Sequence, residues 1–405
     1  MKRWFTCTPV PFRGDEAFFN RDSGLFSRAF RATGAESKAV MPLPWQDGDL
    51  RDELVRTDYA NLESPDWWRQ FHLDGVLLYV WSAAKFRPIV EAVRKAGAKA
   101  VLYQDCGSVV FPWNEWRLGV RMMHRRAKLA HPGNPAAAWA DFLLRLARGH
   151  ASVLHYPARR RLFAAADAVT FPYPAALDAW CRVPGLVPRR IRETAFVLPC
   201  PVAPHFRYDG TPKEPMVVAV GRWDDEEQKR GGLLLRTMEE AWKRRPVPFH
   251  VFGTIPPSFA GWLGALPPGL AALVSFHGRV PNAELATWYN RTQVSLCTSI
   301  HESTHIASAE AVCCGCGVVA PPLSSVSCCH WYASEGSGTV AVEDTPESLA
   351  DAVLSELSAW ESGRRDAAAL SGTWSKRLLA VNSVNGILSR EGSSGTASRQ
   401  DSPIP

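Results

Sequence analysis

Two cations in the second half of the 405-residue sequence stand where a diphosphate could bind. Arg222 follows an apolar run at 216–220, and Lys229 precedes Gly231, where a helical pattern begins. The N-terminus of a helix offers unpaired N–H groups and a partial positive charge, so cations beside it favour a pyrophosphate ligand. The alternative is a solvated loop in which both cations pair with the acidic residues at 224–227, and the spacing does not decide between the two.

Two carboxylates follow further along the chain. Glu302 lies in the loop after a predicted strand at 293–298, and Glu310 lies on the next predicted helix, at 308–314. Carboxylates near the start of one helix can accept hydrogen bonds from the hydroxyl groups of a sugar and of a ribose. The alternative is structural: one Glu favours the helix dipole and the other is an exposed helical residue. For an isolated pair of glutamates this structural interpretation is the more common one.

The elements that would position these side chains alternate between strand and helix patterns. Predicted strands lie at 4–8, 38–41, 75–81, 98–103, 168–171, 196–199, 216–220, 248–252, 273–276, 293–298 and 318–320. Predicted helices lie at 24–30, 86–96, 231–244, 282–290, 308–314 and 346–360. Such alternation produces parallel sheets with helices on both faces, and ligands bind beyond the carboxyl ends of the strands. We therefore predict an α/β fold of two Rossmann-like domains whose parallel sheets face a central cleft.

The chain length favours two domains, because a single hydrophobic core stops growing near about 250–300 residues. A proline-rich connection at 201–215 marks the predicted boundary. We predict an N-terminal domain at 1–200, a C-terminal domain at 201–371 and a segment at 372–390 that crosses back to the N-terminal domain. The Ser- and Gly-rich residues 391–405 are predicted to form a disordered tail.

The composition is that of an ordinary soluble globular protein, with 46% hydrophobic and 21% charged residues. The net charge of +6 suits anionic ligands such as nucleotides or lipid phosphates, but it is too small to indicate nucleic acid. No run approaches the roughly 18 apolar residues of a membrane span, and the start of the chain lacks the apolar stretch of a signal peptide. We therefore expect a cytoplasmic protein.

A basic stretch at 117–161 contains many Arg and Lys residues and a single acidic residue, Asp141. Leucines and methionines are interleaved with the cations, which predicts two helices with basic faces, separated at 131–135. One interpretation is a solvated helical surface. The other is peripheral contact with an anionic membrane or with an anionic acceptor.

Two further patterns raise the question of a metal. Five of the ten cysteines cluster at 313–329, but without the paired C-x2-C spacing of zinc sites, so structural thiols are favoured. Asp47 and Asp49 form a D-x-D pair, which in a metal-dependent sugar transferase would follow an apolar strand. Here the pair follows a proline-containing loop, and we keep this metal-dependent interpretation only as an alternative.

Taken together, the second-half motifs are more specific than any one of them. Glu302 and Glu310, with seven residues between them, resemble the E-x7-E signature of the GT-B glycosyltransferases of family 4, or glycosyl transferases group 1. Segments that resemble further blocks of that family occur in the family's order at 197–202, 220–222, 229–231, 276–280 and 310–319. The resemblance is strong over roughly 196–355 and weaker before it, where Gly24 at the start of the first helix matches mainly in layout.

The resemblance implies transfer of a hexose from a nucleotide diphosphate sugar, with retention of configuration and without a cofactor or a required metal. Arg222 and Lys229 would hold the diphosphate, Glu302 would contact the donor sugar, and Glu310 would bind the ribose. The residues implied in donor binding are Gly221, Gly278, Val280, Ser303, Thr304, His305, Ile306 and Glu310. The acceptor would be a glycan, a lipid or a small molecule, and no nucleic-acid partner is implied.

Several positions depart from the family pattern. Thr304 and His305 stand where the family often has Phe-Gly, so a side chain replaces the glycine that allows close backbone approach. Many members carry a histidine at the tip of an N-terminal strand, where this chain has Gln104 and Asp105. Asp105 is our candidate catalytic group there, and the alternative is a turn-forming Asp before Gly107. His301 is either a plain loop residue or a donor contact. These departures leave open an alternative function, a nucleotide-sugar-binding protein of the same fold without transfer activity.

Overall fold

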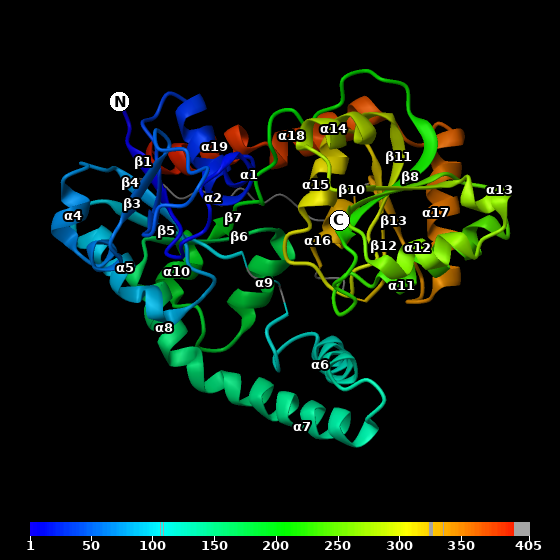
Figure 1. The fold of residues 1–405 in the computed structure, drawn as a ribbon. Helices are drawn as coiled ribbons and strands as arrows, with labels where there is room; N and C mark the ends of the chain where they lie inside the picture. Colours follow the sequence, from blue (N-terminus) through cyan, green and yellow to red (C-terminus); the bar gives the residue numbers. More distant parts are fainter. Residues whose placement is uncertain (106, 108, 324–326, 335, 393–405) are drawn as a thin grey trace.

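The computed structural model describes residues 1–105, 107, 109–323, 327–334 and 336–392. Within them, two parallel sheets form an α/β fold, as predicted (Figure 1). The first sheet has seven strands in the order β3-β2-β1-β4-β5-β6-β7, and the second has six in the order β10-β9-β8-β11-β12-β13. The predicted tail at 391–405 lies outside the described residues from 393 onward.

The strands of the first sheet are β1 (Trp4–Cys7), β2 (Ala39–Pro42), β3 (Leu54–Thr57), β4 (Gly75–Tyr79), β5 (Lys99–Tyr103), β6 (Ala168–Phe171) and β7 (Phe196–Val197). Those of the second sheet are β8 (Glu214–Arg222), β9 (Phe249–Thr254), β10 (Val274–Gly278), β11 (Thr292–Leu296), β12 (Gly317–Ala320) and β13 (Gly338–Val340). Every pair of adjacent strands is parallel.

The helices of the first half are α1 (Glu16–Phe19), α2 (Asp22–Ala32), α3 (Tyr59–Leu62), α4 (Pro65–Arg69), α5 (Arg87–Lys95), α6 (Trp116–Ala130), α7 (Pro135–Ala151), α8 (Tyr156–Ala165), α9 (Pro174–Arg182) and α10 (Arg189–Thr194). Those of the second half are α11 (Gly231–Trp242), α12 (Pro257–Gly264), α13 (Pro268–Ala271), α14 (Asn282–Arg291), α15 (Ile306–Cys313), α16 (Cys328–Tyr332), α17 (Pro346–Glu361), α18 (Ala367–Leu378) and α19 (Ala380–Gly392). None of the helices described here combines the length and the apolar character needed to cross a bilayer.

Two edge strands, β3 and β13, were not predicted from the sequence. The strand β3 contains Arg56, whose charge breaks the apolar pattern by which buried strands are recognised. Its guanidinium is nevertheless buried, because it pairs with Asp49 at 2.9 Å. The helix predicted to open at Gly24 is α2, which begins two residues earlier, at Asp22, and the short helix α1 before it was not predicted.

Three long-range features connect the two halves. The helix α19 packs against α2, so the last helix described lies beside the first sheet (Figure 1). A parallel bridge between Val202 and Leu379 ties the connection after β7 to the segment between α18 and α19. The helices α6 and α7, inserted between β5 and β6, form a hairpin below both sheets (Figure 1). We call α6 and α7 together the arm.

Candidate active site

The predicted diphosphate and sugar residues come from two adjacent parallel strands. Because β8 and β11 are hydrogen-bonded neighbours, the loops that follow them leave the same edge of the second sheet. Two bonds hold these loops together: the hydroxyl of Thr298 donates to the Lys229 carbonyl at 2.7 Å, and the N–H of Ile300 donates to the Gln228 carbonyl at 3.0 Å. The C-terminal edge of a parallel sheet is where such folds bind ligands.

Lys229 and Glu302 form a buried ion pair at this edge. The Lys229 Nζ lies 2.5 Å from Glu302 Oε1, and the side chains are 13% and 5% exposed. The Gln228 amide donates to the other carboxylate oxygen of Glu302 at 3.1 Å. Burial works against ionisation of both partners, but His305 and Lys229 outweigh it and lower the pKa of Glu302, while Glu302 raises the pKa of Lys229. Both groups therefore carry full charge, and the structure brings this predicted pair into contact.

Arg222 lies at the end of β8 with a side chain that is 64% exposed. Its guanidinium pairs with Asp225 at 3.1 Å, and Asp225 also accepts from the N–H of Gln228 at 3.0 Å. The guanidinium is thus held at the open side of the loop by a surface ion pair, which is weak enough for a stronger anion to replace it. Gln228 was not predicted as a site residue, and its only sequence signal is its place beside Lys229.

Gly253 allows β9 to approach β8 closely at Gly221. Gly253, which has a φ of +106°, lies against it, and a Cβ on Gly253 would sit 1.9 Å from the Gly221 carbonyl oxygen. Gly278 ends β10 with a φ of +69°, and nearby Arg279 donates to the Thr254 hydroxyl at 3.0 Å. Val280 packs against the main hydrophobic core. Gly221 therefore lies at the edge shared with the ion pair, whereas Gly278 and Val280 follow the outermost strand of the sheet.

Glu310 is buried in α15, in the second turn after the donor loop, by which we mean residues 299–305. Burial raises the pKa of its carboxyl to about 8, and the positive charge of Arg21 opposes this shift only in part. Arg21 belongs to the first half of the chain, so Glu310 faces the junction of the two halves. A largely protonated buried carboxyl is ready to exchange hydrogen bonds with hydroxyl groups.

Replacement of Glu310 by glutamine should remove a pH-dependent loss of stability. The folded-state pKa of about 8 lies above the ordinary value of 4.5, so unfolding releases a proton between these two values and stability falls as the pH rises through this window. We expect Glu310→Gln and the wild type to have similar melting temperatures at pH 5, and the variant to be the more stable at pH 8.5. Thermal denaturation at both pH values tests this; a constant difference between the two proteins would contradict it.

The donor loop also contacts the first half of the chain. The Thr304 hydroxyl donates to Asp105 at 2.9 Å, across a separation of 199 residues. Burial, assisted by the negative charge of Asp22, raises the pKa of Asp105 to about 6. The neighbouring Gln104 is fully buried and accepts from the Ser82 hydroxyl at 2.6 Å. Asp105 is therefore the polar group of the β5 tip that meets the donor loop.

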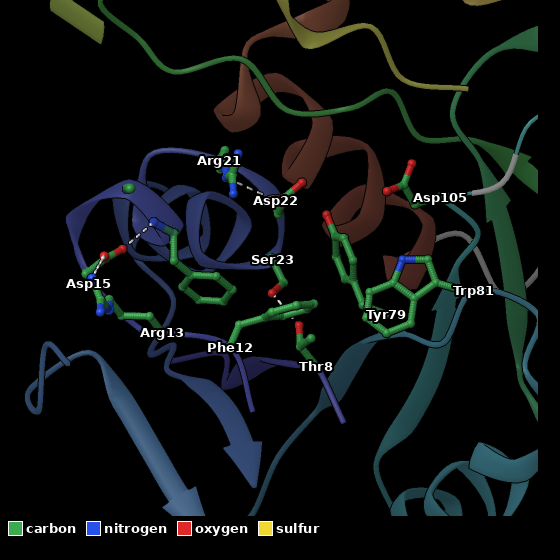
Figure 2. A pocket seen from close by; sticks show the side chains of 12 residues that line it. Thr8, Phe12, Arg13, Asp15, Arg21, Asp22, Ser23, Tyr79, Trp81 and Asp105 are labelled. Atoms are coloured by element: carbon green, nitrogen blue, oxygen red, sulfur yellow. Dashed lines mark hydrogen bonds and ion pairs between the residues drawn. The ribbon is translucent and has the colours of Figure 1, made fainter. Parts of the chain in front are cut away.

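Asp105 also lines a cavity of about 480 Å³ beside the first sheet (Figure 2). The aromatic rings of Phe12, Tyr79 and Trp81 form part of the wall, and Asp22 points toward the space from the start of α2. Further lining residues are Thr8, Arg13, Asp15, Ala17, Phe18, Arg21 and Ser23. Aromatic faces combined with a few carboxylates and cations suit a sugar-like ligand that carries an anionic group. Apart from Asp105, this wall was not predicted, because its residues come from separate loops.

The imidazole of His305 is directed into the protein. Its Nδ1 lies 2.7 Å from the Ser308 hydroxyl, and its backbone N–H donates to the thiol of Cys328 at 3.2 Å. Ligand-type atoms of His305, Cys297 and Cys329 lie within 4.8 Å of one another, all buried. Ile306 begins α15 directly after this histidine, and Ser303 lies two residues before it in the donor loop. The side chain of His305 therefore points into the protein and stabilises the donor loop.

Arginines of the arm hold the acidic part of the loop that follows β8. Arg125 donates to the Glu226 carbonyl at 2.5 Å, to the Glu226 carboxylate at 2.8 Å and to the Glu227 carbonyl at 3.1 Å. Arg126 pairs with the Glu227 carboxylate. The sequence left open that the acidic residues at 224–227 pair with both site cations. Of these residues, Asp225 pairs with Arg222, whereas two other acidic side chains pair with the arm. This alternative is therefore only partly correct.

Loss of Arg125 should loosen this loop. We expect Arg125→Ala to accelerate amide hydrogen exchange in 223–230 by about tenfold, because several hydrogen bonds to a charged donor disappear. The matched control is Arg148→Ala, on an exposed position of α7. Exchange measured by mass spectrometry checks this, and equal exchange in the two variants would contradict a role for Arg125 in holding the loop.

The D-x-D pair does not form a cluster of available carboxylates. Asp49 accepts from the N–H groups of Gly14 at 2.7 Å and Gln46 at 2.9 Å, and from two nitrogens of Arg56. Burial opposes its ionisation, but Arg56 and the two N–H groups outweigh burial and lower its pKa. Asp47 is exposed. Asp49 is thus committed to the local fold.

Comparison with known proteins agrees with this architecture. Residues 214–358 match the family model described as Glycosyl transferases group 1. Comparison with curated protein sequences finds no match. HepE of Anabaena, solved in complex with UDP-glucose, aligns with a TM-score of 0.62 and 12% identity over 96% of this chain and 99% of that chain. A glycosyltransferase from Rickettsia africae aligns with a TM-score of 0.63 and 11% identity, over 96% and 97% of the two chains.

Sucrose-phosphate synthase from Thermosynechococcus elongatus aligns with a TM-score of 0.57 and 14% identity, over 96% of this chain and 99% of that chain. Identities this low establish the fold alone, which is the two-sheet GT-B architecture. Together with the family match, this fold defines the class of the protein, a glycosyltransferase. The match to the model of glycosyl transferases group 1 lies in the second half of the chain, at residues 214–358, where the E-x7-E motif predicts it.

Proposed function

We propose that the protein transfers a hexose from a nucleotide diphosphate sugar to an acceptor bound beside the first sheet, with retention of configuration and without a metal. The single observation that carries the proposal is the buried cluster of Lys229, Glu302 and Gln228, in which Glu302 belongs to the donor loop that meets Asp105. An ammonium, a carboxylate and an amide that converge from two adjacent loops can serve the diphosphate and the sugar together.

In this proposal the diphosphate binds between Arg222 and Lys229. Its negative charge competes with Glu302 for the ammonium of Lys229, which frees the Glu302 carboxylate to accept hydrogen bonds from the donor sugar. As the sugar departs, charge accumulates on the diphosphate, and the two cations stabilise it electrostatically. Glu310 receives the ribose hydroxyls, in keeping with its buried position and its raised pKa.

The acceptor binds in the cavity of about 480 Å³ that Asp105 lines. With a pKa of about 6, Asp105 is mostly ionised at neutral pH and can accept a hydrogen bond from the attacking hydroxyl. The rings of Phe12 and Trp81 offer surfaces for a sugar ring, and Arg13 at the rim suits a phosphate or carboxylate on the acceptor.

A thermal-shift screen against nucleoside diphosphates and their sugar conjugates tests the donor assignment, because a ligand that binds the folded state raises the melting temperature. UDP-glucose is the first probe, since HepE was solved with it. We expect stabilisation by one nucleotide sugar, and release of its nucleoside diphosphate with a suitable acceptor whether or not EDTA is present. Binding without any turnover would favour the alternative of a nucleotide-sugar-binding protein, and loss of turnover in EDTA would contradict metal-independent transfer.

The arm provides a reason to propose peripheral contact with an anionic membrane as well. The helix α7 exposes Trp139, Leu143 and Leu144, and Arg145 and Arg148 lie on the same helix. Exposed apolar side chains beside cations are typical of helices that lie in a bilayer interface. We expect co-sedimentation with vesicles that contain phosphatidylglycerol, weakened when Trp139 and Leu143 are both replaced by serine. No sedimentation with either kind of vesicle would favour a solvated surface, and equal sedimentation with uncharged vesicles would contradict a preference for anionic lipid.

A further inference from the structure

His301, immediately before Glu302, carries a buried imidazole whose two nitrogens have no hydrogen-bond partner in the described part of the chain. Its exposed fraction is 8%, and neither Nδ1 nor Nε2 has a hydrogen-bond partner within the described residues. A buried polar group without a partner lowers the stability of the folded protein, so such groups call for a functional explanation.

The surroundings of His301 place it at the meeting point of the two domains. A Cβ added to Gly107, which follows β5, would lie 2.6 Å from His301 Nε2 and 3.1 Å from the Ser303 hydroxyl. Gly107 itself is held by Trp180, whose indole N–H donates to the Gly107 carbonyl at 2.9 Å. The imidazole therefore lies between the donor loop and the β5 tip, the region that also contains the Asp105–Thr304 contact.

His301 also lines a cavity of about 190 Å³ next to the buried ion pair. The cavity is closed on one side by Met122 and Arg126 of the arm, and Gln228 and Ser303 add neutral polar groups to the wall. Pockets for whole drug-sized ligands occupy roughly 300–1,000 Å³. This smaller space suits a single sugar unit better than a nucleotide.

The charge state of the imidazole restricts what it can bind. Burial lowers the pKa of His301 to about 4, with Glu302 raising it and His330 lowering it. The other charged groups around the cavity are Arg126 and Glu227, which pair with each other. At neutral pH the ring is therefore uncharged, with one nitrogen that donates and one that accepts. A hydroxyl group likewise both donates and accepts, so the two are complementary.

We propose that His301 binds a hydroxyl group of the donor's sugar and thereby distinguishes the nucleotide sugar from the bare nucleotide. The assignment rests on the proposed function. It adds a sugar-binding imidazole contributed by the C-terminal domain. The strand tip of the N-terminal domain has Gln104 and Asp105 instead of a histidine.

The test compares the affinities of UDP and UDP-glucose, and in parallel of GDP and GDP-mannose, for wild type and for His301→Leu. We expect the variant to bind the bare nucleotide within twofold of the wild type and the nucleotide sugar about tenfold more weakly, the loss of roughly one hydrogen bond. Removing an unpaired buried polar group should also raise the melting temperature by about 2–4 °C. His301→Gln, which keeps a donor and an acceptor, should restore part of the sugar-dependent affinity.

His330→Leu is the matched control, because the half-buried His330 has a partner, the Pro321 carbonyl at 3.0 Å. It should lower the melting temperature and leave the ratio of the two affinities unchanged. The inference is overturned if His301→Leu destabilises the protein and keeps the ratio, or if wild type binds nucleotide and nucleotide sugar equally. A wild type that prefers the nucleotide sugar but transfers nothing removes the proposed transfer, while the His301 assignment stands.

Discussion

Replacing Lys229 by methionine is expected to lower the rate of sugar transfer by about 10²–10³-fold, the usual cost of removing one preorganised group that stabilises developing charge. Methionine keeps the length and most of the volume of the side chain, but it cannot neutralise the departing diphosphate. Initial rates at saturating donor and acceptor check this, because a group that acts in the transition state lowers kcat rather than raising KM alone.

The same substitution also leaves Glu302 buried without its cation, which destabilises the protein independently of catalysis. The double variant Lys229→Met with Glu302→Gln separates the two effects, since it removes both charges together. We expect it to regain most of the lost melting temperature and to remain as inactive as the single variant. The surface control is Lys243→Ala, whose ammonium pairs with Glu240 on an exposed helix end. Recovery of activity in the double variant would contradict a catalytic role for Lys229.

Replacing Asp49 by alanine is expected to lower the free energy of unfolding by about 3–5 kcal/mol, the range measured when one partner of a buried ion pair is removed. The side chains of Arg56 and Asp49 are 0% and 2% exposed, so the remaining guanidinium would lie buried without its carboxylate. Two N–H groups, of Gly14 and Gln46, would lose their acceptor as well. Urea denaturation followed by circular dichroism measures the loss.

Asp47→Ala is the matched control for this prediction. Asp47 belongs to the same D-x-D pair but is exposed, so its removal should change stability by less than about 0.5 kcal/mol. A metal-dependent transferase would respond differently: both aspartates would be required for activity, and EDTA would mimic their loss. Equal loss of activity in the two variants, without loss of stability in either, would revive that interpretation.

The sequence was informative where a local pattern has one dominant physical cause. The continuous apolar run at 75–81 and the largely apolar run at 98–103, interrupted only by Lys99, predict buried strands, and they occur as β4 and β5. The alternation of strands and helices likewise implied parallel sheets, because a crossover helix is the usual connection between parallel strands. Arg56 is the exception. A charged residue interrupts the apolar pattern that predicts a buried strand, and only the structure identifies the partner that allows Arg56 to be buried.

Contacts across the domain junction were beyond the reach of sequence patterns. The basic stretch at 117–161, which contains most of the arm, was predicted to be helical, with a solvated surface or contact with an anionic membrane or acceptor as its role. The arm pairs directly with Glu226 and Glu227, which lie about one hundred positions further along the chain. A local sequence pattern carries no information about contacts between residues so far apart. The inward direction of the His305 side chain is of the same kind, because a loop sequence does not specify which way a side chain turns.

The sequence by itself determined the α/β class, the E-x7-E motif and the identity of the charged groups, because these depend on residue type and spacing along the chain. Only the tertiary structure decided that Lys229 is paired with Glu302, that Asp105 meets Thr304, and that the His301 ring has no hydrogen-bond partner among the residues the structure describes. Each of these depends on which loops converge at the edge of a sheet. Where these loops meet, side chains become buried, and burial shifts their pKa values and separates polar groups from possible partners. Burial is a property of the folded chain as a whole.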